Sequence, residues 1–305
     1  MSRVVCDRFI GIVEAIGRDL LGKEDAIALV LCAFFARGHV LLEDIPGSGK
    51  TTLAKSLSST LGLEFGRIQF TSDMLPSDIL GVSYYDQKSS KFILKKGAIF
   101  TQFLLCDEIN RSMPKTQSAL LEAMAEHSVS IDGVTYNLDE PFFVIGTQNP
   151  QEEVGVFTLP MSQLDRFICS FGIGYPSREA EREVLLSTTK QSLSEPILGL
   201  EQIEQILAEV LEVHLSDAMI NYMQDIIAYT RDSGKFVYGL STRGALALRD
   251  MCKSWATLQG RNFATPDDLQ SVAMSVFAHR LRAKDRSLSA KQICDDIFKN
   301  TTAEI

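Results

Sequence analysis

The sequence predicts an α/β fold, a parallel sheet with helices on both faces, followed by a second domain built of helices. Three observations support it. Short apolar runs alternate with helical patterns through the first part of the chain, which is typical of strands buried in a parallel sheet. A Ser/Thr-rich stretch then separates two kinds of pattern. Beyond that stretch, strand signals stop and helical spacing takes over. The apolar runs are residues 40–42, 68–70, 103–106, 142–145 and 168–171.

The polar stretch at residues 187–196 marks the predicted boundary, giving an αβα domain over 1–190 and a helical domain over 196–305. A helix start is expected at residues 265–268, Thr-Pro-Asp-Asp, because a hydroxyl can cap it, proline suits the first turn and acids oppose the helix dipole. The first helix of this domain is expected to place six apolar side chains on one face: Leu200, Ile203, Ile206, Leu207, Val210 and Leu211.

The segment Asp44 to Thr51, D-I-P-G-S-G-K-T, has the form of a phosphate-binding loop between a strand and a helix. Gly47 and Gly49 let backbone N–H groups turn toward phosphate oxygens, and the next helix adds the positive end of its dipole. Lys50 can reach the β- and γ-phosphates, and the Thr51 hydroxyl suits Mg²⁺. A Gly/Pro turn with an unrelated lysine is the alternative. The context favours a nucleoside triphosphate site made by Pro46, Gly47, Ser48, Gly49, Lys50, Thr51 and Thr52.

Two carboxylates, Asp107 and Glu108, end the apolar run 103–106. We expect Asp107 to face the shell of a bound Mg²⁺ and Glu108 to polarise an attacking water. Acidic pairs at strand ends often only begin a turn. The phosphate loop about one strand–helix unit earlier favours the catalytic interpretation.

Three further polar residues stand at element boundaries. Asn149 tips the run that begins at residue 142, where an amide can orient water and γ-phosphate, although Asn149-Pro150 alone would indicate only a turn. Arg166 and Arg243 are isolated arginines, which usually form surface ion pairs. The order of these features along the chain is more specific than any one of them.

In that order the chain resembles the MoxR family of AAA+ ATPases, over about residues 20–281. Asp44 replaces the first glycine of the general loop pattern, a departure shared with the family. Thr242 stands where the family usually has Pro, and Met161-Ser162 where it usually has Glu-Ala. The resemblance rests on LLEDIPG (41–47), DEINR (107–111), KTQSALLEAM (115–124), GTQNP (146–150), LP (159–160) and QLDRF (163–167).

The resemblance implies a P-loop NTPase αβα sandwich with a five-stranded parallel sheet, a helical lid, and a homo-oligomeric ring, commonly a hexamer. It implies that Arg166 is an arginine finger reaching the neighbouring subunit's γ-phosphate. Asn149 would be the first sensor and Arg243 the second. Gly22, within Leu-Leu-Gly-Lys at 20–23, would lie near the adenine, and Gly133 would turn a hairpin before the Asn149 strand. Family members typically remodel proteins, often with a von Willebrand A domain partner.

Composition narrows the function classes. The net charge of −9 argues against general nucleic-acid binding, which needs clustered Lys and Arg. The longest apolar run, residues 26–36, is about half a membrane span, so we expect no membrane insertion and a cytoplasmic protein. Six scattered cysteines without C-x-x-C spacing predict reduced, mainly buried thiols.

The leading hypothesis is an ATP- and Mg²⁺-dependent ATPase that assembles, remodels or matures client proteins. A nucleotide-dependent scaffold or switch that does not hydrolyse ATP is the alternative, although a pure switch would not need Glu108, Asn149 and Arg166 together. A DNA-acting motor is a third possibility. Residues 128–138, the expected hairpin region, contain no Lys or Arg, which argues against it.

Overall fold

A five-stranded parallel sheet forms the centre of the computed structural model, which describes residues 5–45, 47–149, 155–186, 195–285 and 287–301. The strand order across the sheet is β2-β5-β8-β1-β9. Each of the five predicted apolar runs supplies one strand, so this prediction is confirmed. The strands are β1 (Val40–Glu43), β2 (Phe65–Gln69), β5 (Phe103–Asp107), β8 (Phe143–Gln148) and β9 (Cys169–Phe171).

Both faces of the sheet are covered. Successive strand residues point to opposite faces; in β5, Leu105 joins one apolar cluster and Leu104 the other. This arrangement is the predicted αβα sandwich. The first cluster includes residues of α1 (Asp7–Asp19), α2 (Glu24–Phe35) and α3 (Lys50–Thr60), and the second includes residues of α4 (Pro76–Leu80), the 3₁₀ turn η1 (Ile109–Arg111) and α5 (Pro114–Glu126).

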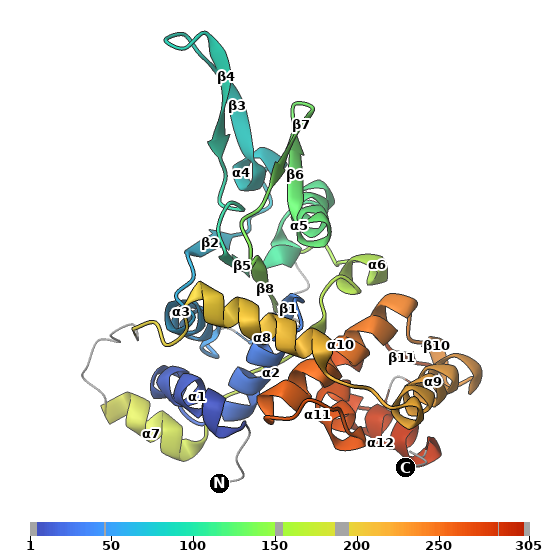
Figure 1. Ribbon diagram of the computed structural model, residues 1–305. Coiled ribbons are helices and arrows are strands. Elements are labelled where there is room, and N and C mark those ends of the chain that lie inside the picture. Colours follow the sequence, from blue (N-terminus) through green and yellow to red (C-terminus); the bar gives the residue numbers. More distant parts are fainter. Residues whose placement is uncertain (1–4, 46, 150–154, 187–194, 286, 302–305) are drawn as a thin grey trace.

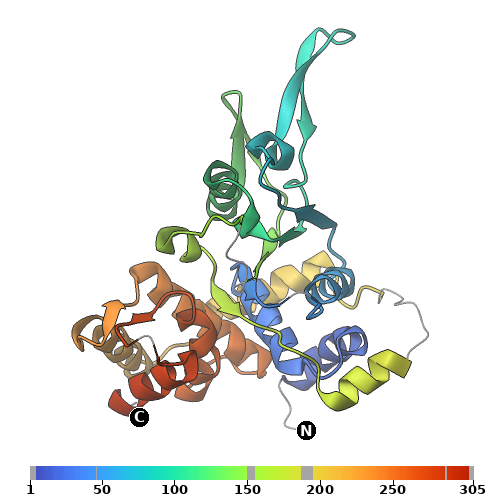
Figure 2. The same ribbon diagram turned by 180° about the vertical axis from the view of Figure 1, so that it is seen from behind.

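Two β-hairpins project together from one end of the molecule (Figures 1 and 2). The hairpin of β6 (Ser128–Ile131) and β7 (Val134–Asn137) was expected, and Gly133 lies in its turn with φ +80°. The hairpin of β3 (Gly81–Asp86) and β4 (Lys91–Lys96) was not predicted. Its apolar side chains are largely exposed, so they form no buried run that periodicity would detect.

The C-terminal lid, residues 200–301, is helical as predicted, apart from a short antiparallel ribbon of β10 (Phe236–Tyr238) and β11 (Arg282–Ala283). The expected helix start at residues 265–268 is confirmed: Thr265 is the N-cap residue of α11, and its N–H and hydroxyl both donate to the Asp268 carboxylate. The lid helices are α8 (Leu200–Glu212), α9 (Asp217–Asp232), α10 (Thr242–Leu258), α11 (Pro266–Phe277) and α12 (Ala290–Asn300).

The apolar face predicted for α8 is narrower than expected. Leu200 and Leu211 are 46% and 63% exposed, whereas the other four side chains are buried against the main core. At about 100° per residue, Leu200 and Leu211 lie together along one edge of the apolar stripe, beside the four buried side chains.

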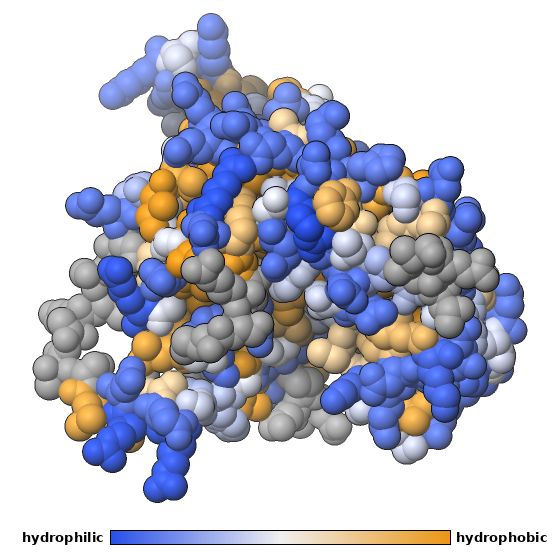
Figure 3. All heavy atoms as spheres, turned by 60° about the horizontal axis from the view of Figure 1, so that its bottom comes forward, coloured by the Kyte–Doolittle hydropathy of each residue, from blue (hydrophilic) through white to orange (hydrophobic). Residues whose placement is uncertain are grey.

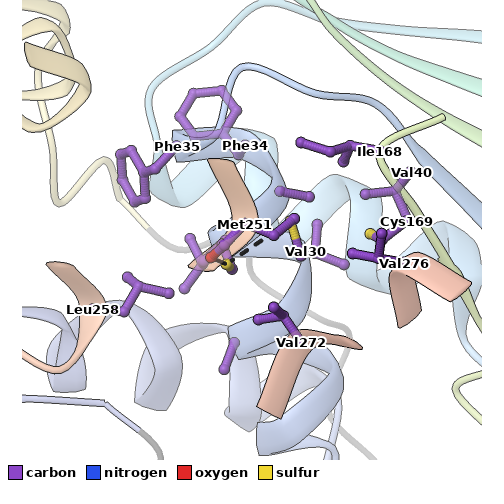
Figure 4. Packing of buried hydrophobic residues seen from close by; sticks show 14 of the residues in the cluster. Val30, Phe34, Phe35, Val40, Ile168, Cys169, Met251, Leu258, Val272 and Val276 are labelled. Carbon is purple, nitrogen blue, oxygen red and sulfur yellow. Dashed lines mark hydrogen bonds between the residues drawn. The ribbon is translucent and has the colours of Figure 1, made fainter. Parts of the chain in front are cut away.

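The lid packs directly on the αβα part of the chain. Met251 of α10 lies beside Val30 of α2, and Val276 of α11 lies beside Cys169 of β9 (Figure 4). The Ser254 hydroxyl also donates a hydrogen bond of 2.7 Å to the Cys32 carbonyl. One apolar cluster therefore runs through both parts. The predicted boundary falls mostly on residues 187–194, outside the described residues, between α7 (Arg178–Leu186) and α8.

The cysteines and the surface agree with the composition. All six cysteines are free thiols and five are buried. Burial raises the pKa of Cys169 to about 12. Among the described helices none is both long and apolar enough to cross a membrane. Hydrophilic residues dominate the face in Figure 3, with hydrophobic ones scattered between them.

Candidate functional site

The phosphate loop leaves the carboxyl end of β1 and enters α3, as the sequence predicts. Gly47 and Gly49 have φ of +84° and +91°, which a residue with a side chain adopts only with strain. Ser48 is buried, and its hydroxyl has no hydrogen-bond partner among the described residues. Thr51 and Thr52 lie half-buried in the first turn of α3, while Pro46 is outside the described residues.

Lys50 folds back over the loop. Its Nζ donates to the carbonyls of Asp44 and Ile45 at 2.9 and 2.8 Å. Burial lowers the pKa of Lys50, while the carboxylates of Asp44, Asp107 and Glu108 act in the opposite direction. The charge of Lys50 therefore interacts with both Asp107, the predicted metal ligand, and Glu108, the predicted catalytic carboxylate.

Asp44, the departure from the general loop pattern, has a structural role. Its Oδ2 accepts a 2.7 Å hydrogen bond from the Gly174 N–H, and its Oδ1 accepts one from its neighbour Ile45 at 2.9 Å. The carboxylate thus fixes the entrance of the loop to the segment after β9. A glycine could not make these bonds.

Asp107 ends β5 and is buried, with two partners. Arg67 Nε of β2 lies 2.8 Å from its Oδ2, and the Thr147 hydroxyl of β8 lies 3.3 Å from its Oδ1. The Thr147 hydroxyl also accepts a 3.0 Å bond from the Glu108 N–H. Thr147 therefore ties the acidic pair to the strand that carries Asn149.

Glu108 leaves the sheet in a left-handed conformation, φ +57° and ψ +49°. Its Oε2 accepts from Gln69 Nε2 at 2.8 Å and lies 2.7 Å from Arg111 Nε. These three residues line a cavity of about 410 Å³. Glu108 is thus held at the carboxyl end of its strand, where it borders a cavity that water can enter.

Asn149 directly follows β8, which lies between β5 and β1 in the sheet. Its half-buried side chain therefore lies at the carboxyl ends of the strands, between the acidic pair and the phosphate loop. Gly22 has φ +68° in the turn before α2. The adjacent Leu20 is buried, and a Cβ on Gly49 would lie 2.6 Å from its Cδ1, so segment 20–23 packs against the loop.

Arg166 lies apart from these residues. It follows α6 (Met161–Leu164), and its Nη1 donates to the Leu121 carbonyl of α5 at 2.7 Å. It lines a cavity of about 560 Å³ between α5 and the β6–β7 hairpin, whose described lining contains no phosphate-loop residue. Arg243 is exposed in the first turn of α10 and forms no hydrogen bond or ion pair within the described part of the chain.

Comparison with known proteins agrees with this geometry. Residues 39–169 match the family model of the ATPase family associated with various cellular activities (AAA), and residues 228–297 match the AAA lid domain. Chaperone MoxR1 of Mycobacterium tuberculosis is 37% identical over 87% of this chain and 73% of its own length. The chain belongs to the MoxR family of AAA+ ATPases.

Two further relatives cover nearly the whole chain. Protein YeaC of Bacillus subtilis, itself uncharacterised, is 43% identical over 94% of this chain and 92% of its own length. A solved structure from Cytophaga hutchinsonii, described as a candidate ATPase, has a TM-score of 0.89 and 33% identity and covers 98% of this chain and 96% of that one. The MoxR-type fold, helical lid included, therefore extends over the chain.

The site of this MoxR-family chain fits a nucleotide with Mg²⁺. The unpartnered Ser48 hydroxyl, the positive φ at both loop glycines and the Lys50 ammonium suit phosphate oxygens. Thr51 and Asp107 offer the oxygen ligands that Mg²⁺ takes beside substrate phosphates. No cluster of three or more His, Cys, Asp or Glu able to hold a metal occurs in the described residues.

Sequence reasoning missed several residues that hold this MoxR-family site together. The β2–β5 register pairs Gln69 with Asp107 and places Arg67 two residues earlier. Thr147, two residues before Asn149, was a detectable signal because it lies near the end of the strand that precedes Asn149. Asp165 and Arg280 form an ion pair over a sequence separation of 115 that no local pattern shows.

Proposed function

We propose that this chain hydrolyses ATP to ADP and phosphate in a Mg²⁺-dependent reaction, and that hydrolysis drives remodelling, assembly or maturation of partner proteins. The convergence of Lys50, Asp107 and Glu108 carries the proposal. A strand-end carboxylate pair beside a phosphate-loop lysine is the arrangement that nucleoside triphosphate hydrolysis requires.

The residues have distinct proposed roles. Loop N–H groups, Ser48, Lys50 and Thr52 bind phosphate oxygens, and Thr51 with Asp107 holds Mg²⁺, which neutralises phosphate charge when bound. Gly22 and its neighbours border the adenine. Asn149, at the edge between acidic pair and loop, orients the attacking water and the γ-phosphate.

Glu108 is the proposed water-activating group. The carboxylates of Glu108 and Asp107 have different hydrogen-bond partners, so that one side chain can serve the metal and the other the water. Gln69 and Arg111 hold the carboxylate by one oxygen, Oε2.

Arg166 is proposed to act on the nucleotide of a neighbouring subunit in a ring, commonly hexameric in this family. Its cavity is separate from its own phosphate loop as far as the structure describes it, which supports action in trans. Arg243, exposed and without a described partner, is available to respond to nucleotide from the lid.

The biological setting is also a proposal. The name of the relative chaperone MoxR1 supports the proposal that this chain acts on client proteins. The von Willebrand A domain partner and the cytoplasmic location are proposed from the sequence and the family resemblance. Nucleic acid and membrane insertion are not part of the proposal. A non-hydrolysing scaffold remains the alternative, and it predicts normal ATP binding with no turnover in the wild type.

The test is Glu108→Gln, which keeps the size of the side chain but removes the base. ATP binding should stay normal, while hydrolysis falls by at least about 10²-fold, the usual effect of a lost general base. Glu140→Gln is the matched control, because it removes a carboxylate from the exposed pair with Arg37. Turnover of Glu108→Gln near the wild-type value would contradict the assignment.

A further inference from the structure

The segment that carries Arg166, residues 165–168, is held by the lid. Asp165 Oδ1 lies 2.6 Å from Arg280 Nε, and its Oδ2 accepts from the Ser241 hydroxyl at 2.7 Å. On the other side of Arg166, the Phe167 carbonyl lies 3.0 Å from His279 Nε2. Three lid residues thus contact the two neighbours of the finger.

Arg280 is the centre of this contact. Its guanidinium is 3% exposed and donates five hydrogen bonds, equal to the number of its N–H groups. Besides the Asp165 carboxylate, it binds the carbonyls of Asp165, Phe167, Ile168 and Val276. Because a buried guanidinium fork with all donors used has one favourable position, the backbone around Arg166 has one position relative to the lid.

The same contact reaches the first turn of α10. Ser241 caps this helix by accepting from the Gly244 N–H at 2.9 Å while it donates to Asp165. A Cβ on Gly244 would lie 2.9 Å from Arg280 Cδ, so the helix start packs closely on the arginine. Arg243, the proposed nucleotide sensor, lies between Ser241 and Gly244 in the chain.

We propose that Asp165 and Arg280 are positioning residues that fasten the arginine finger to the lid of its own subunit, so that the lid of one subunit sets the hydrolysis rate in its neighbour's site. This inference rests on the proposed trans role of Arg166. A shift of Arg243 toward nucleotide moves the start of α10 and Ser241 with it, and the Asp165–Arg280 pair passes that shift to Arg166. The two nucleotide sites are thereby coupled through hydrogen bonds and one buried ion pair.

Arg280→Lys and Asp165→Asn test the proposal. Lysine keeps the charge but cannot bind four carbonyls and a carboxylate in one plane, and asparagine keeps the size of the aspartate but removes its charge. Each variant should bind ATP within about twofold of wild type and lose about 10²-fold in turnover, the size expected of a misplaced catalytic group. Asp165→Asn keeps the test available if Arg280→Lys fails to fold.

Mixing separates action through the finger from a general defect. Subunits with Lys50→Ala have an inactive phosphate loop but an intact finger, so mixing them with Arg280→Lys or Asp165→Asn subunits should restore activity. The control is Arg261→Lys, at the Arg261–Asp268 ion pair elsewhere in the lid, which should keep wild-type turnover.

Two results would overturn the inference. In the first, Lys50→Ala subunits rescue Arg166→Ala but do not rescue Arg280→Lys or Asp165→Asn. The trans role of the finger would then stand, and only its proposed link to the lid would be refuted. The second is failure to rescue Arg166→Ala itself, which would refute the trans finger of the proposed function and this inference with it.

Discussion

The phosphate loop and the finger segment are built in opposite ways. Lys50 is held by carbonyls five and six residues earlier in the chain, so the loop conformation is local. The finger segment 165–168 is held by Arg280 and Ser241, 115 and 76 residues beyond Asp165. The difference shows that the phosphate loop is fixed by contacts within its own segment, whereas the position of the segment that carries Arg166 depends on the lid.

Burial follows the same division. Lys50 and Thr51 are half-buried at an edge that a ligand can reach. Arg280 and His279 are almost fully enclosed, and burial lowers the pKa of each. A ligand can therefore contact Lys50 and Thr51 directly. It can affect the finger segment only if the packed lid helices move.

The largest effect is expected at the loop. Lys50→Ala should abolish nucleotide binding and all turnover, because it removes the mobile cation that faces the β- and γ-phosphates. Titration with a fluorescent ATP analogue measures the affinity. Lys55→Ala, one turn further along α3 and exposed, is the control and should bind normally. If Lys50→Ala retained its affinity for the ATP analogue, the proposed nucleotide site would be refuted. The comparison between the phosphate loop and the finger segment would then no longer hold.

The second effect is expected at the finger. Arg166→Ala should leave ATP binding intact and lower turnover strongly; a trans arginine is worth roughly 10³–10⁵ in rate in small GTPases. Wild-type turnover per subunit should rise with protein concentration, and mixing with Lys50→Ala subunits should restore some activity.

Arg249→Ala, which removes an arginine from the exposed pair with Asp250 in α10, is the control for this experiment. Turnover that does not depend on concentration, together with no rescue on mixing, would show that Arg166 acts within its own chain. The finger segment, like the phosphate loop, would then affect only the nucleotide site of its own subunit.

The smallest effect concerns acid stability and involves one histidine from each region. His39 is buried at the start of β1, with Nδ1 accepting from the Val144 N–H at 3.1 Å, and burial lowers its pKa to about 4. Burial and the Arg280 charge lower the pKa of His279 well below its usual value. Between about pH 6.5 and pH 4 the unfolded chain binds more protons at His39 than the folded chain does.

The free energy of unfolding should therefore be unaffected by His39 above about pH 6.5 and fall by up to about 1.4 kcal/mol per pH unit as the pH drops toward 4. Urea unfolding at pH 7.5 and pH 5 measures this change. His39→Gln and His279→Gln should each make it smaller, although each variant is less stable at pH 7.5. Equal pH dependence in wild type and both variants would show that other groups control acid unfolding.

The sequence was sufficient to predict the sheet and to propose a nucleotide site on it. The five strands, the phosphate loop, Asp107 and Glu108 are encoded by short patterns, because a strand buried on both faces needs a continuous apolar run and phosphate binding needs glycines beside a lysine. The β3–β4 hairpin was missed because Tyr85 and Phe92 pair with each other in solvent, 5.4 Å between ring centroids, rather than in a core.

Only the tertiary structure decided what holds the site residues. The contacts of Thr147 with Asp107 and Glu108, of Gln69 with Glu108, and the grip of Arg280 on segment 165–168 join residues between 39 and 115 positions apart. The sequence alone was enough to propose the phosphate loop, since residues 46–52 lie together in the chain. It did not specify the lid contacts of the finger, because a buried ion pair depends on which elements the core brings together, and that is settled by packing rather than by local pattern.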